Sequence, residues 1–275
     1  MYLTFDTETT GLPKNYSAPI SDFDNWPRMV QIAWQVNNKN GGLISSQVHI
    51  IKPENFTIPY NSEQIHGIST EKAIKEGEKL ETILNKINKD LKVYKYIIAH
   101  NINFDIKILG AEFLRCNIET NLSEKESIDT GLISREFCQL EGGLNGKFKM
   151  PKLIELHQIL FNAGFSDAHD ASADVNATAK CFFELIKKNI FKTGDSNAEK
   201  INYVGIESKV SNFSNKRQKV IKVSKKVSNN LIKEPFIHLH NHSQYSILQA
   251  TSSIKKIVEK ALMDKMPAVA LTDLG

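Results

Sequence analysis

Two carboxylates at the end of the first predicted strand constrain this chain more than any other feature of its sequence. Residues Tyr2–Asp6 alternate apolar and polar side chains, as a β-strand with one buried face does. Asp6 and Glu8 are two residues apart, so on a strand they project from the same face. Two like charges this close repel each other unless a cation lies between them, and carboxylate oxygens are ligands that Mg²⁺ prefers. The alternative interpretation is a solvated strand end with incidental acids, because a D-x-E pair alone is a weak motif.

Two further acidic elements occur at the ends of predicted secondary structure. The segment HNINFD at 100–105 follows the short apolar strand predicted over Tyr96–His100, which places Asp105 on the first turn of a helix. The segment HDASAD at 169–174 stands at the entry to a helix predicted over Ser172–Lys188. Taken singly, Asp105 is typical of a helix cap and His169 of an ordinary loop histidine.

Together the three elements resemble the three motifs of the DEDDh family of 3′→5′ exonucleases. Asp6 and Glu8 match the first motif, Asp105 the second, and His169 with Asp174 the third. The segment IHGIS at 65–69 also resembles one that is typical of the proofreading subclass. The resemblance spans residues 1–190 and implies an α/β, ribonuclease H-like fold, in which a mixed sheet is flanked by helices.

The same resemblance implies two-metal phosphodiester hydrolysis. Two divalent ions, Mg²⁺ or Mn²⁺, would lie ~3.5–4 Å apart. Asp6 is expected to bridge both ions, Glu8 and Asp174 to complete the nucleophile-side site, and Asp105 to support the second ion. His169 is expected to be the general base, since its unperturbed pKa near ~6.5 suits proton transfer around neutral pH. The residues expected to contact the 3′-terminal nucleotide are the backbone amides of Thr9, Thr10 and Gly11, the side chain of Leu12, and His66.

The remaining pattern up to residue 190 alternates strands with helices, which predicts a mixed sheet. A hairpin is predicted from strands over 30–36 and 47–51, joined by a turn at 38–42. Helices are predicted over 80–91 and 104–114, and another from Pro151 to a stop before Gly164.

Positive charge is concentrated in one segment. Residues 187–233 contain 12 Lys or Arg and 3 Asp or Glu, a local charge of +9, in a chain whose total is +4. The body of the chain is therefore acidic. We predict a basic linker over residues 191–234, since no strand or helix period survives there. The alternative is a strap that lies along nucleic-acid phosphates.

Beyond the linker, residues 235–275 begin a second domain. The strand FIHLH at 236–240, a helix near 253–263 and the strand AVALTD at 268–273 predict a β-α-β unit. This unit resembles the start of a PHP domain, the domain that opens the alpha subunit of bacterial DNA polymerase III. His240 and His242 match the H-x-H-S motif and Asp273 the T-D-H motif, but Leu274 stands where a metal-ligating His is usual. Forty residues are too few to bury a core, so we expect the sequence to be the front end of a longer or truncated polymerase III alpha-type protein.

Composition excludes several classes of protein. Cys116, Cys138 and Cys181 share no close spacing, which argues against a disulfide scaffold and a zinc cluster and favours a reducing, cytoplasmic (bacterial) compartment. No apolar run approaches the ~18 residues of a membrane helix. The expected partners are a single-stranded primer 3′ end, replicative polymerase domains and a sliding clamp. Two alternatives remain: an RNA-trimming relative of oligoribonuclease or RNase T, and a catalytically idle module that only binds DNA or the polymerase.

Overall fold

The computed structural model describes residues 1–143, 146–164, 171–205 and 254–263. The chain divides into two compact units, Met1–Glu207 and Ser208–Gly275. In the described part of the second unit, α9 (Ile254–Met263) forms where a helix is predicted. The two strands predicted around it lie outside the described residues, as do His240, His242, Asp273 and Leu274. None of the helices in the described ranges is long and apolar enough to cross a membrane.

The first unit is built on a five-stranded mixed sheet of order β3-β2-β1-β4-β5. β1 (Tyr2–Thr9), β2 (Met29–Asn37) and β3 (Leu43–Ile50) are antiparallel, and β4 (Tyr96–Ala99) and β5 (Glu126–Asp129) continue the sheet parallel to β1. The predicted mixed sheet and early hairpin are confirmed. β5 is missing from the sequence-based prediction, because it has four residues and only its last two are buried.

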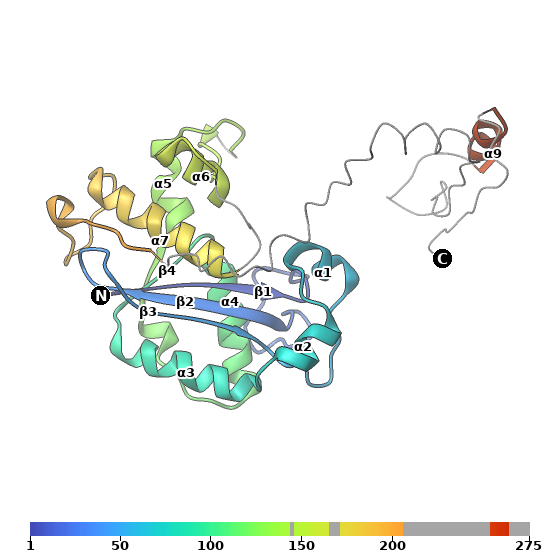
Figure 1. Cartoon of the computed structure of the whole chain (residues 1–275), viewed down its shortest axis with the longest axis horizontal. Helices are drawn as coiled ribbons and strands as arrows, with labels where there is room; N and C mark the ends of the chain where they lie inside the picture. The colour runs from blue at the N-terminus through green and yellow to red at the C-terminus, as the bar shows by residue number, and fades with distance from the viewer. Residues whose placement is uncertain (144–145, 165–170, 206–253, 264–275) are drawn as a thin grey trace, which may run out of the picture. The chain divides into compact units, whose positions relative to one another are not determined.

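Helices cover both faces of this sheet (Figure 1). α7 (Ala171–Lys187) lies on one face, and α3 (Leu80–Val93) and α4 (Ile102–Arg115) lie on the other. All three were predicted to within a few residues. The remaining helices are α1 (Tyr60–His66), α2 (Thr70–Glu76), α5 (Thr130–Cys138) and α6 (Leu153–Phe161). Of these only α6 was predicted, and it begins two residues after Pro151.

The two faces of β1 carry different side chains, and this alternation positions the acids. Leu3 and Phe5 pack into the core formed with α3 and α4. Tyr2 faces the opposite way, into a cluster with Phe182 and Phe183 of α7. Because the side chains of a strand alternate, Asp6 and Glu8 share the face of Tyr2. The alternation therefore directs both carboxylates toward the face of the sheet that α7 covers.

The first unit continues past α7. A short 3₁₀ helix, η3 (Ala198–Lys200), follows it, and Ile201 and Tyr203 pack into the same buried cluster as Phe182 and Phe183. Residues 191–205, placed in the linker by composition, thus belong to the folded unit. We propose a domain boundary near residue 207 in place of 190.

Candidate active site

Three carboxylates converge where β1 ends against the first turn of α7. The side-chain oxygens of Asp6, Glu8 and Asp174 lie within 4.8 Å of one another, and all three residues are half-buried. Opposite ligands of a Mg²⁺ octahedron are about 4.2 Å apart, so a small closure would bring these oxygens onto one cation. The donor set is all carboxylate, which fits a hard divalent cation such as Mg²⁺ or Mn²⁺.

Asp105 is attached to this cluster through β1. It lies on the first turn of α4, is 3% exposed, and its Oδ1 accepts hydrogen bonds from Thr7 N (3.0 Å) and Thr7 Oγ1 (2.7 Å). Thr7 stands between Asp6 and Glu8, so the second motif is bonded to the backbone of the first. Asp105 is not one of the three groups whose oxygens converge.

Burial sets the charge state of Asp105. It raises the pKa of this carboxyl to about 7, although the bonds from Thr7 oppose the rise, and nearby Asp129 adds to it. A carboxylate that is costly to ionise when buried gains much from a neighbouring cation. The site therefore favours a metal on electrostatic grounds as well as by its donors.

Asp129 is a supporting residue that the sequence analysis missed. It ends β5 and caps α5, and its carboxylate accepts four backbone N–H groups at once. Oδ1 accepts from Asn101 (3.1 Å), Gly131 (2.9 Å) and Leu132 (3.3 Å), and Oδ2 from Ile102 (3.2 Å). Asp129 therefore holds the N-termini of α4 and α5 together, next to the first turn of α4, which carries Asp105. An Asp at an N-cap position is the pattern that would have indicated it, but the sequence analysis predicted no helix over 130–138.

His100 ties a further segment to the same region. Its Nδ1 is 2.9 Å from Thr130 Oγ1 and its Nε2 is 2.9 Å from Pro151 O. Burial lowers the pKa of this imidazole, so the ring is neutral near pH 7. The contact fixes the start of the α6 segment against the end of β4.

The loop after β1 presents part of the predicted nucleotide-binding set. Thr9 Oγ1 donates to Gly11 O (2.7 Å), and Leu12 is 74% exposed. The amide of Thr10, however, donates to Arg28 O (2.9 Å), so it is already engaged within the protein. The predicted set of three nucleotide-binding amides therefore loses Thr10, and the amides of Thr9 and Gly11 stay predictions.

His66 lies beside this loop, at the C-terminal end of α1. Its Nδ1 accepts a hydrogen bond from Ile68 N (3.2 Å). Partial burial lowers the pKa of the ring, and its contact with the backbone of Thr9 offsets part of that effect. The structure therefore brings His66 next to the first motif, from which it is separated by more than 50 residues. His169, the expected general base, lies outside the described residues.

Comparison with known proteins agrees with this arrangement. The model of the exonuclease family (RNase_T) matches residues 3–182, and the model of the PHP domain matches residues 238–275. The 3′-5′ exonuclease DinG of Staphylococcus haemolyticus is 25% identical over 187 residues, which is 68% of this chain and 18% of that protein. A DNA polymerase III PolC-type of Streptococcus thermophilus is 28% identical over 201 residues, 73% of this chain and 12% of that protein.

A 40-residue match is closer in sequence. The DNA polymerase III subunit alpha of Chlamydia trachomatis is 65% identical over this length, 14% of this chain and 3% of that protein. The chain thus spans less than a fifth of the length of each of these three relatives. Among solved structures, Escherichia coli exonuclease I in complex with a dT13 oligonucleotide superposes with a TM-score of 0.54 at 23% identity, covering 68% of this chain and 40% of that one.

The superposition shows that the fold is shared, and the family model covers well over half of the chain. The carboxylate cluster lies within the matched residues. The predicted ribonuclease H-like exonuclease fold is confirmed, and the chain belongs to the exonuclease (RNase_T) family.

Proposed function

We propose that this chain removes nucleotides from the 3′ end of single-stranded DNA by metal-dependent hydrolysis. The observation that carries the proposal is the convergence of Asp6, Glu8 and Asp174 on an exonuclease fold. The relatives that match most of the first unit include a 3′-5′ exonuclease and PolC-type DNA polymerases. These names favour DNA over RNA as the substrate.

Each of the predicted site residues has a proposed role in hydrolysis. Divalent cations, when bound, supply a Lewis acid for the scissile phosphate. Asp6, Glu8 and Asp174 hold the cations, and Asp105, fixed by Thr7, completes the acidic set. His169 takes the proton of the attacking water, the role of a general base.

The terminal nucleotide is bound by the loop after β1. We assign the exposed side chain of Leu12 to contact with a base, and the backbone at Gly11 to contact with the sugar and phosphate. The neutral ring of His66 lines the same side of the site, next to Thr9.

We further propose that the exonuclease proofreads for a replicative polymerase. The PHP-domain match after the linker and the alpha-subunit match both favour this assignment. A mispaired 3′ end frays into a single strand, which is the form of substrate proposed above for this site. A sliding clamp as partner and a cytoplasmic location stay predictions.

The decisive experiment is hydrolysis of a mismatched DNA primer by the full chain. We expect activity that EDTA abolishes and that Mg²⁺ or Mn²⁺ restores. Asp6→Asn should reduce hydrolysis to background and leave binding of single-stranded DNA largely intact, whereas the exposed control Asp24→Asn should have no effect. A preference for short RNA would support the RNA-trimming alternative, and binding without hydrolysis under every metal condition would support the idle module.

A further inference from the structure

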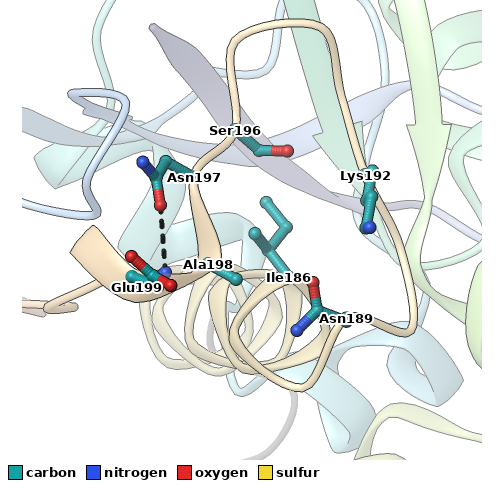
Figure 2. A pocket seen from close by; sticks show the side chains of 7 residues that line it. All are labelled: Ile186, Asn189, Lys192, Ser196, Asn197, Ala198 and Glu199. Atoms are coloured by element: carbon teal, nitrogen blue, oxygen red, sulfur yellow. Dashed lines mark hydrogen bonds between the residues drawn. The ribbon is translucent and has the colours of Figure 1, made fainter.

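The segment that follows α7, residues 191–205, turns back and packs against other parts of the first unit. Figure 1 shows this orange stretch beside α7. In its first part, Lys192, Ser196, Asn197 and Glu199 surround a cavity of about 420 Å³ with Ile186 of α7 and with Asn189, just beyond the end of that helix (Figure 2). In its last part, Asn202 N donates to Asn40 O (2.8 Å) and Val204 N to Gly41 O (3.1 Å), which joins it to the turn between β2 and β3.

Tyr203 inserts between β2 and α7 at the end of this segment. Its hydroxyl donates to Asn176 Oδ1 (2.7 Å) and accepts from Gln35 Nε2 (3.1 Å). Its ring stacks on Phe183, with centroids 5.6 Å apart and planes at 25°. Burial raises the pKa of the phenol to about 12, so the hydroxyl keeps its proton at neutral pH and the donated bond persists.

The face of β2 beneath α7 explains why this insertion matters. Gln31, Ala33 and Gln35 alternate along the strand and therefore share one face. Gln31 Oε1 accepts from the amide of Ala171 (3.3 Å), the first residue of α7. Ala33 packs against Ala171 and Val175, and it is also the register partner of Asp6.

The first half of α7 is therefore bonded to β2 at two points. One is direct, through Gln31 to the first turn. The other passes from Gln35 through Tyr203 to Asn176, two residues beyond Asp174. The small side chains between the two points let α7 approach β2 closely. The two polar links then fix the rotation of α7 about its axis and its distance from β2. Those two variables decide where the Asp174 carboxylate lies relative to Asp6.

We propose that Tyr203 is a positioning residue for Asp174, and that the segment at 191–205 is part of the support of the metal site. The proposal rests on the proposed function in that Asp174 is taken as a metal ligand. The segment at 191–205 leads along the chain into residues 208–275. The residue proposed to set the geometry of the site, Tyr203, therefore lies near the start of the connection between the two units.

Tyr203→Phe in the full chain tests this inference. The variant keeps the ring stack on Phe183 and removes only the hydroxyl, so it should fold. The matched control is Tyr2→Phe, because the Tyr2 hydroxyl bonds Thr193 of the same segment without contacting the first half of α7. Mn²⁺ binding is measured by electron paramagnetic resonance, with thermal unfolding and hydrolysis at saturating Mn²⁺ as companions.

We expect the Mn²⁺ dissociation constant to rise about 3–10-fold in Tyr203→Phe, at or below the range seen when the direct partner of a metal ligand is removed. In Tyr2→Phe it should stay within about twofold, at a similar loss of thermal stability. Asn176→Ala should raise it no more than Tyr203→Phe does, because the backbone Asn176 O, 3.2 Å from the Tyr203 hydroxyl, remains as an acceptor, and the double variant should be no worse than Tyr203→Phe. Equal Mn²⁺ affinity in the two Tyr variants would overturn the inference alone, whereas a parent chain that binds no Mn²⁺ would overturn the proposed metal site as well.

Discussion

Asp129→Asn tests the residue that connects two helix starts beneath the site. The substitution keeps the size of the side chain but removes its charge and one acceptor. Three of the four bonds reach Oδ1 and one reaches Oδ2. The asparagine oxygen will therefore take the Oδ1 position, and its NH₂ group will face the amide of Ile102.

The magnitude follows from these contacts. Three bonds change from charge-assisted to neutral, and one buried N–H loses its acceptor at about 1–3 kcal/mol. Neutralising Asp129 also removes one of the causes that raise the pKa of Asp105, which offsets part of the loss. We expect a net destabilisation of about 3 kcal/mol. For a domain of 150–250 residues this corresponds to a fall in Tm of roughly 6–12 °C.

Thermal unfolding, followed by circular dichroism, measures the loss of stability, with Asp24→Asn as the exposed control. Hydrolysis of a single-stranded oligonucleotide well below Tm measures the loss of activity. We expect a loss of about tenfold, because the turn that carries Asp105 loses its bond at Ile102 and keeps only a weaker, neutral bond at Asn101. A Tm equal to that of the control would refute the claim that this carboxylate stabilises the two helix starts. Unchanged turnover with a lowered Tm would refute its role in positioning Asp105.

Three further outcomes are expected. His169→Ala should lower kcat by roughly 10²–10⁴-fold with metal affinity unchanged, and a loss of metal affinity with preserved kcat would make His169 a ligand instead. Glu112→Gln should destabilise the first unit by about 3–5 kcal/mol in urea unfolding, because the fully buried Glu112 carboxylate pairs with Arg28 (3.0 Å) and Arg115 (3.2 Å). An unchanged urea midpoint would show that the two arginines do not need a charged partner. Because the pKa of Tyr203 is raised from 10.0 to about 12 in the folded chain, the unfolded chain loses this proton first, and stability must fall as pH rises from about 10 to 12. The stability advantage of the parent chain over Tyr203→Phe should shrink across that window, and a constant difference would contradict the assignment.

Local patterns carried much of the prediction of the fold. The apolar spacing of Ile83, Leu84 and Ile87 indicated α3, and the alternation of β1 indicated that Asp6 and Glu8 share a face. Both depend on periodicities that the backbone imposes within a few residues. β5 and the two seven-residue helices α1 and α2 are too short to show a period, so the sequence analysis missed them.

Composition was a poorer guide to the end of the first unit. Residues 191–205 are mostly polar, as a linker is, and only Phe191, Ile201 and Tyr203 pack into the buried cluster. Isolated apolar residues without a period do not indicate a docked segment. One of their contact partners, Tyr2, lies at the opposite end of the first unit's sequence.

The sequence by itself was enough to predict which residues carry the chemistry, since the acids lie at strand and helix ends that local patterns predict. Only the tertiary structure decided how those residues are held. The bond from Thr7 to Asp105 spans 98 positions, and the link from Gln35 through Tyr203 spans 168. Such contacts depend on strand order and on how closely α7 approaches β2. Those are properties of the packed core, where side chains far apart in the sequence share one close-packed volume.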